Sequence, residues 1–131
     1  YRGRSVVISG DSNVNGDTLD IVNGADLLLH DALSLSTVSS LSAALSDAGR
    51  PRQSKVVGDV IDYHASTESL IELGKQSNVD MVAFYHLVPT PLNSILAEIF
   101  MHGAPDNFLL AEDLMWFELP LNSDEIVVNR P

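Results

Sequence analysis

The sequence contains no cysteine and few basic residues. The absence of cysteine from all 131 residues excludes a disulfide scaffold and any zinc site built from thiolates. Only 7 Lys and Arg residues stand against 18 Asp and Glu residues, which gives a formal net charge of −11. Nucleic-acid affinity depends mainly on basic side chains that neutralise phosphates. We therefore predict that this chain by itself binds RNA or DNA poorly.

Several sequence signals are also missing. No apolar run approaches the roughly 20 residues that a membrane helix requires, and no basic segment precedes an apolar one at the N-terminus. There is no glycine-rich phosphate loop, no Gly-x-Ser-x-Gly motif, no internal repeat and no linker. We predict one unit over residues 1–131, without a membrane segment, and favour a cytoplasmic location. The first residue is Tyr1 rather than Met, which suggests that upstream sequence is missing.

Short β-branched runs alternate along the chain with segments in which apolar residues recur every three or four positions. The first pattern is typical of buried strands and the second of amphipathic helices. This alternation favours the α/β class. We predict strands over residues 5–9, 25–31 and 80–85, helices over residues 17–24 and 35–48, a helical face over residues 56–61, helices that begin near residues 66 and 92, and a terminal meander of short strands over residues 107–111, 114–119 and 125–129.

Candidate chemical groups lie at the ends of these predicted strands. Asp11 follows the first strand, Asp31 ends the second and His86 follows the third, while His64 precedes a helix. In open α/β sheets, ligands gather at the carboxyl ends of strands. A carboxylate can bridge two divalent ions, and a neutral imidazole supplies one nitrogen to one ion. From spacing alone, a turn or cap role for Asp11 and an exposed position for His64 remain open.

Two other histidines and a basic cluster have simpler interpretations. His30 lies within an apolar strand, so we predict a hydrogen-bonded core histidine. His102 lies near a helix C-terminus, where a cation complements the helix dipole, and we assign it no chemistry. Arg50, Arg52 and Lys55 form the sole basic cluster. We interpret this cluster as a solvated turn.

Five segments of the chain form a recognisable series: residues 3–11, 24–32, 62–66, 86–89 and 111–115. Taken in order, they resemble the C-terminal half of a metallo-β-lactamase-fold hydrolase of the ribonuclease Z and arylsulfatase-like branch. Together they extend over nearly the whole chain. The resemblance implies the C-terminal half of a four-layered αββα fold, with a mixed sheet and flanking helices, as a single partial domain over residues 1–131.

The resemblance also implies a role for each candidate residue. Asp11 would bridge two zinc ions, or other divalent metals, and His86 would bind one of them. His64 would face the substrate and stabilise or protonate the leaving group. Asp31 stands where ribonuclease Z carries a glutamate that orients this histidine, and its side chain is one methylene shorter. We therefore name Asp11 and His86 as metal ligands, and His64 and Asp31 as catalytic residues.

The upstream His-x-His-x-Asp-His loop on which the zinc site of this family depends has no counterpart among the four histidines of the chain. A catalytic zinc ion needs about three protein ligands and a water molecule, more than Asp11 and His86 supply. We therefore expect this chain to be inactive by itself and to be part of a larger metal-dependent hydrolase.

The acidic charge favours a small-molecule substrate, so we expect hydrolysis of an ester, phosphodiester or sulfate ester. One alternative is a ribonuclease Z-type tRNA 3′-processing endonuclease, which needs positive charge from elsewhere. Another is a non-catalytic interaction domain that kept the fold and lost the metal loop. For all three alternatives, the sheet face and strand edges that would meet the missing half of the fold are expected to be exposed. Such surfaces favour self-association, so we predict a homo-oligomer.

Overall fold

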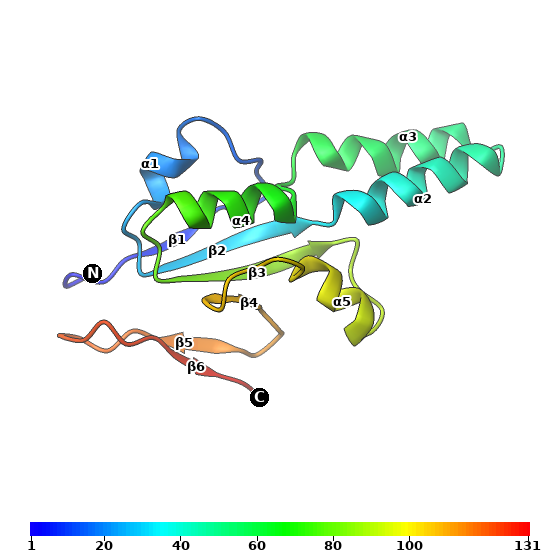
Figure 1. The fold of residues 1–131 in the computed structure, drawn as a ribbon. Coiled ribbons are helices and arrows are strands. Elements are labelled where there is room, and N and C mark those ends of the chain that lie inside the picture. Colours follow the sequence, from blue (N-terminus) through cyan, green and yellow to red (C-terminus); the bar gives the residue numbers. More distant parts are fainter.

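The computed structural model describes residues 1–131 and confirms the α/β class (Figure 1). Helices and strands occur where the apolar periodicity predicts them, although the second and third strands extend two to three residues beyond their predicted ends. In chain order, the elements are β1 (Val6–Ile8), α1 (Thr18–Val22), β2 (Leu27–Leu33), α2 (Leu35–Asp47), α3 (Pro51–Asp59), a 3₁₀ turn (Val60–Asp62), α4 (Thr67–Gln76), β3 (Met81–Val88), α5 (Ser94–Phe100), β4 (Phe108–Leu110), β5 (Trp116–Glu118) and β6 (Val127–Asn129).

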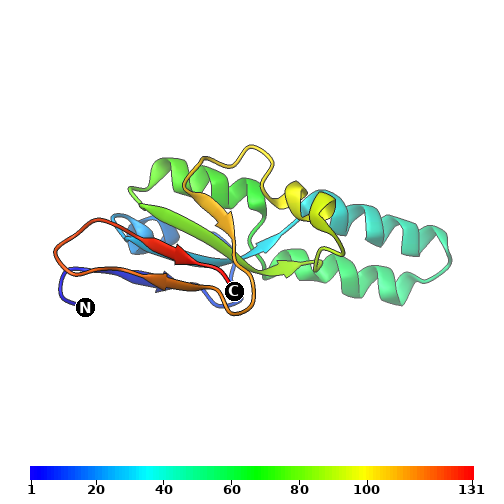
Figure 2. The ribbon, with the colours of Figure 1, turned by 90° about the horizontal axis from the view of Figure 1, so that it is seen from below.

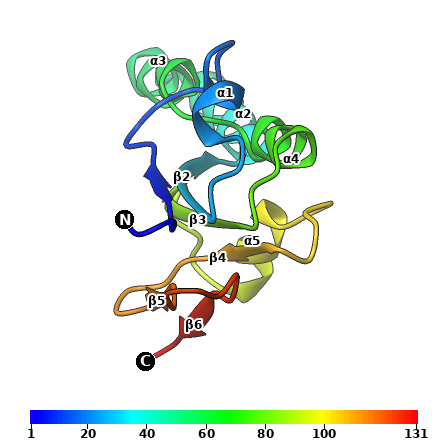
Figure 3. The ribbon, with the colours of Figure 1, turned by 90° about the vertical axis from the view of Figure 1, so that its left-hand side faces the viewer.

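The main sheet has four parallel strands in the order β1-β2-β3-β4. Parallel neighbours need a crossover connection, and successive right-handed crossovers in one direction place their helices on one face. Figure 3 shows α1 and α4 on that face and the β5–β6 hairpin on the opposite side of the sheet. Antiparallel pairing is confined to β5 and β6.

The predicted terminal meander is wrong for its first strand. β4 pairs in parallel with β3, because α5 lies between these strands and returns the chain to the start of the sheet. An isolated three-residue strand carries no periodicity that distinguishes parallel from antiparallel pairing. This difference adds a fourth parallel strand to the sheet.

The hydrophobic core lies between the helical face and the sheet. Leu28 of β2 and Phe84 of β3 face Leu70 of α4, and each is at most 1% exposed. Phe84 also meets Phe108 of β4 edge to face, with ring centroids 5.5 Å apart. Burying a side chain such as Leu70 contributes about 1.5–3 kcal/mol. This packing fixes the strands whose ends carry the candidate site.

Helix α4 begins at a side-chain cap. The Ser66 hydroxyl accepts a hydrogen bond from the backbone N–H of Ser69 at 3.1 Å, which satisfies one of the free donors at a helix N-terminus. Ser66 also bridges to Leu33 at the end of β2. The cap therefore holds the segment that contains His64 against the carboxyl edge of the sheet.

Helices α2 and α3 form an antiparallel pair that extends away from the sheet (Figures 1 and 2). Small residues allow the two helices to approach closely: the Ser42 hydroxyl donates to the Ser54 carbonyl at 2.9 Å. Arg50 and Arg52, from the predicted basic cluster, lie at the far end of this pair and are exposed, whereas Lys55 pairs with Asp59 at 2.6 Å.

No helix of the chain has the length and apolar character needed to cross a membrane.

The side of the sheet away from the helices is joined to the β5–β6 hairpin. Arg4, directly before β1, pairs with Asp26 at 2.6 Å and donates to the carbonyl of Ser123. On this side Val6 is 49% exposed, and Trp116 of the hairpin is 52% exposed. β1 is also an edge strand with no neighbour beyond it. Open edges beside apolar side chains favour association between chains.

We expect the chain to self-associate through the β1 edge and the adjacent apolar surface. Substituting Val6→Lys should lower the average mass measured by light scattering at high concentration, because a charge on an edge strand blocks pairing. Leu92→Lys is the matched control, since Leu92 is 88% exposed and lies outside the sheet. A native chain that remains monomeric at every concentration would contradict the expectation.

Candidate metal centre

Three of the four predicted site residues come together at the carboxyl edge of the parallel sheet. Asp11, His64 and His86 each offer one ligand atom within 4.8 Å of the other two. His86 Nε2 lies 3.6 Å from Asp11 Oδ1. The rings of His64 and His86 stack with centroids 5.3 Å apart. The arrangement agrees with the rule that chemistry gathers where parallel strands end.

Asp11 reaches this edge through a tight turn after β1. Gly10 has φ +62°, a left-handed conformation that glycine adopts at little cost. The Asp11 side chain remains 58% exposed and that of His86 49% exposed. Two polar groups with open sides are suited to accept a ligand from solvent.

His86 is positioned by an irregularity in the sheet. Tyr85 pairs with Asp31 and Leu87 pairs with Ala32, so His86 is an extra residue of β3 with no partner on β2. Its φ is +44°, which is uncommon outside glycine. Such bulges re-aim a side chain and occur often beside active sites. The sequence suggested that the strand ends before His86; the structure shows that β3 continues to Val88.

His64 is buried, so the exposed position left open by its spacing is wrong. The residue is 5% exposed, and its Nδ1 lies 3.0 Å from the carbonyl oxygen of Val60. A carbonyl only accepts, so Nδ1 carries the hydrogen. The other nitrogen, Nε2, is buried without any hydrogen-bond partner. Because buried polar atoms are normally paired, this nitrogen marks a place for a ligand or a reacting group.

Asp31 is fully buried beneath the cluster and joins its two loops. Oδ1 accepts a hydrogen bond from the backbone N–H of Ser12 at 3.2 Å, and Oδ2 accepts one from the backbone N–H of Ala65 at 3.2 Å. Ser12 follows Asp11, and Ala65 follows His64. Asp31 makes no hydrogen bond to His64 itself. The structure therefore connects Asp31 to the histidine through the backbone rather than through a direct side-chain pair.

His30 is the core histidine that its position in an apolar strand predicts. It is 1% exposed, and Nδ1 lies 3.0 Å from Asp31 Oδ1. Burial by itself would raise the pKa of Asp31. The hydrogen bonds from His30, Ser12 and Ala65, together with the charge that His30 carries when protonated, outweigh burial and hold the pKa of Asp31 below its usual value.

The donor set suits a divalent metal ion. One carboxylate oxygen and two imidazole nitrogens are ligand types that zinc accepts, and a catalytic zinc ion combines three protein ligands with water. Two ligands of a tetrahedral zinc ion lie about 3.4 Å apart, close to the 3.6 Å between His86 Nε2 and Asp11 Oδ1. The unpartnered Nε2 of His64 is the further group available at the cluster.

The fold and the site define an α/β protein with a carboxylate–imidazole cluster at the carboxyl edge of a parallel sheet. No protein-family model matches the chain. The chain is similar to ribonuclease Z from Archaeoglobus fulgidus, with 27% identity over 124 residues. The match covers 90% of this chain and 33% of that protein, so the chain spans about a third of the relative's length. This similarity supports a distant relationship to ribonuclease Z and nothing finer.

Replacing Asp31 by Asn should destabilise the protein at pH 7 by about 1–3 kcal/mol, because an amide cannot accept from both loops without leaving a buried group unpaired. The folded pKa of Asp31 is lowered, so its stabilising contribution is complete above the unfolded value of about 3.9 and is lost as pH falls through the folded value. Urea unfolding at pH 7 and pH 3 should therefore show the difference between the two proteins narrowing in acid. Asp113→Asn, an exposed carboxylate without hydrogen bonds, is the control. A difference that widens at pH 3 would refute this account.

The left-handed backbone at His86 predicts an unusual order of stabilities. His86→Gly should be more stable than His86→Ala by about 1 kcal/mol, because only alanine has a Cβ that opposes this conformation. Thermal unfolding of the metal-free variants measures this order. If the alanine variant proved equally stable, the bulge would not impose this conformation.

Proposed function

We propose that this chain supplies part of the metal centre of a hydrolase that cleaves phosphodiester bonds in nucleic acid. The observation that carries the proposal is the convergence of Asp11, His86 and the unpartnered Nε2 of His64. The similarity to ribonuclease Z favours the nucleic-acid alternative over the small-molecule ester expected from composition. The more specific version of this nucleic-acid proposal is a tRNA 3′-processing endonuclease.

In this proposal Asp11 and His86 hold divalent metal. A divalent metal held there would supply a water-derived nucleophile at neutral pH and polarisation of the scissile bond. The bulge at His86 keeps its nitrogen aimed at Asp11 instead of along the sheet. Further ligands would come from residues outside this chain, since the relative is about three times as long.

His64 acts on the leaving group. Its Nδ1–H donates to the Val60 carbonyl and so fixes the ring. Nε2, when it also carries a proton, would donate that proton to the leaving oxygen and return to the neutral form. Stacking on His86 keeps the ring beside the metal ligands. Asp31 positions both loops through Ser12 and Ala65 and does not touch the substrate.

The charge of the chain imposes a condition on this function. A net charge of −11 repels a nucleic-acid backbone. Divalent ions at Asp11 and His86 would offset part of that charge locally. The remaining positive charge would come from other segments of the intact protein, because this chain has only 7 Lys and Arg residues.

The assignments are tested by alanine substitutions in the intact enzyme. Asp11→Ala and His86→Ala should each lose metal and activity together, because each removes a ligand. His64→Ala should retain metal and lose about 10²–10⁴-fold in rate, as expected for a missing general acid. Metal content after dialysis and hydrolysis of bis(4-nitrophenyl) phosphate measure the two effects. His102→Ala is the control, since His102 is exposed at the end of α5 and lies outside the cluster.

Loss of metal in the His64→Ala variant would overturn the leaving-group role and make His64 a third ligand. Full metal content and activity in the Asp11→Ala or His86→Ala variant would overturn the metal centre itself. Either result is independent of which nucleic acid the enzyme cleaves.

The substrate class is tested by comparing a precursor tRNA with small aryl esters and sulfate esters. The intact enzyme should cleave the RNA at higher kcat/KM, and its RNA affinity in a gel shift should fall as salt rises, because phosphate binding releases counterions. Faster cleavage of an aryl ester, with no RNA shift at any salt concentration, would restore the small-molecule alternative. An intact protein that binds no metal and cleaves neither substrate class would favour the non-catalytic interaction domain.

A further inference from the structure

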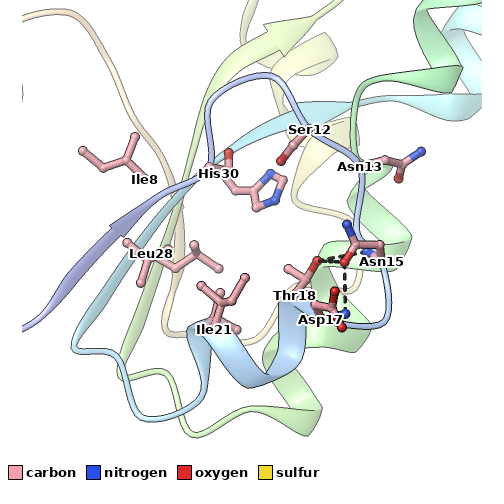
Figure 4. A pocket seen from close by; sticks show the side chains of 12 residues that line it. Ile8, Ser12, Asn13, Asn15, Asp17, Thr18, Ile21, Leu28 and His30 are labelled. Carbon is pink, nitrogen blue, oxygen red and sulfur yellow. Dashed lines mark hydrogen bonds between the residues drawn. The ribbon is translucent and has the colours of Figure 1, made fainter.

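A cavity of about 320 Å³ lies between β1, α1 and β2, beside the loop that carries Asp11 (Figure 4). Leu28 and His30 of β2 form one side of it, and Val7 of β1 and Ile21 of α1 provide further apolar walls. Ser12, the residue directly after Asp11, lies at its rim. Cavities that bind small ligands begin at about this size and combine apolar walls with a few polar groups. None of the roles proposed above uses this cavity.

The buried residue His30 lines the cavity and has one ring nitrogen that makes no hydrogen bond within the chain. His30 is 1% exposed, and its Nδ1 lies 2.9 Å from the Asp31 carbonyl oxygen and 3.0 Å from Asp31 Oδ1. Both oxygens only accept when Asp31 is ionised, so Nδ1 carries the hydrogen and Nε2 of the neutral ring is an acceptor. No group of the chain bonds to Nε2. Figure 4 shows the His30 ring at the cavity, so this atom offers an acceptor to a ligand's O–H or N–H.

The rim selects against anions. Asn15 Oδ1 accepts hydrogen bonds from the Asp17 backbone N–H at 3.0 Å and the Thr18 hydroxyl at 3.2 Å (Figure 4). The Asn15 amide nitrogen, the Asp17 carboxylate and the Ser12 hydroxyl make no hydrogen bonds within the chain. No Lys or Arg lines the cavity. A phosphate would meet a carboxylate there, whereas an uncharged ring with hydrogen-bond donors would meet free partners.

The cavity is connected to the candidate metal centre. Asp31 receives the hydrogen of His30 and also accepts the backbone N–H of Ser12. A ligand that donates to His30 Nε2 would therefore contact the ring that hydrogen-bonds to Asp31. Asp31 in turn holds the Asp11 loop in place through Ser12.

We propose that this cavity binds the uncharged nucleoside part of the nucleic-acid substrate, a base with its ribose, while the phosphate lies at the metal centre. The base packs against the apolar side chains of Val7, Ile21 and Leu28, and an amine or hydroxyl donates to His30 Nε2. This proposal rests on the proposed function, since only a nucleic-acid substrate brings a base and a phosphate together.

The test uses adenosine and cytidine, which lack phosphate and need no metal. Titration of the metal-free protein, followed by amide NMR shifts, should give binding at concentrations up to about 10 mM, with shifts confined to the residues that line the cavity. His30→Phe should weaken binding about tenfold by removing the acceptor. Ile21→Ala should weaken it several-fold, because Ile21 supplies an apolar wall and is 66% exposed, which makes the substitution safe for folding. Ile95→Ala, at an equally apolar position that is 73% exposed on α5, should have no effect.

The outcomes separate this proposal from the proposed function. Hydrolysis of bis(4-nitrophenyl) phosphate, which has no base, reports on the metal centre alone. Hydrolysis without nucleoside binding, or binding unchanged in the Ile21→Ala protein, overturns the nucleoside cavity. Benzene that binds as tightly as adenosine also overturns it, because the cavity would then select by apolar surface only. Nucleoside binding without hydrolysis by the intact protein supports the cavity and overturns the proposed function.

Discussion

The buried carboxylate of Asp31 is the group on which the candidate metal centre depends. Its two oxygens accept backbone N–H groups from the Asp11 loop and from the His64 segment, and His30 supplies a further hydrogen bond from within the sheet. Charge-assisted hydrogen bonds of this kind are stronger than neutral ones. One side chain thus brings together two loops that are far apart in sequence. Beside it, the two loops are joined by the hydrogen bond from the Asn13 amide to the Ile61 carbonyl at 3.4 Å.

The second constraint is the bulge in β3. A regular parallel strand would continue to pair at His86 and direct its side chain along the alternation of the sheet. The extra residue interrupts this pairing, and the left-handed backbone turns the imidazole toward Asp11. Such a conformation costs about 1–3 kcal/mol and persists where packing on both sides enforces it. Here the enforcing elements are β2 and the core beneath Phe84, so the stability of the sheet maintains the geometry of the candidate site.

The same sheet edge separates two kinds of environment. On the open side, the Asp11 and His86 side chains are about half exposed and suited to a cation and a charged substrate group. On the α1 side, the cavity has apolar walls, one carboxylate and no basic residue. His30 and Asp31 lie between these two sides, and Asp31 contacts both loops. Under the proposed function, the phosphate and the uncharged ring of a nucleic-acid substrate would therefore meet different surfaces of this strongly acidic chain.

The local sequence determined the elements and the edge at which the chemistry gathers. Strand and helix positions follow from apolar periodicity, and Asp11 and His86 were predicted from their places after apolar runs, because parallel strands bring their carboxyl ends to one edge. Only the tertiary structure decided the parallel pairing of β4, the bulge at His86, the burial of His64 and the contact of Asp31 with Ala65 instead of His64. These features depend on pairing register and on hydrogen bonds between residues more than 20 positions apart. Local sequence propensity does not predict such contacts, since they form only when the packed sheet brings the loops together.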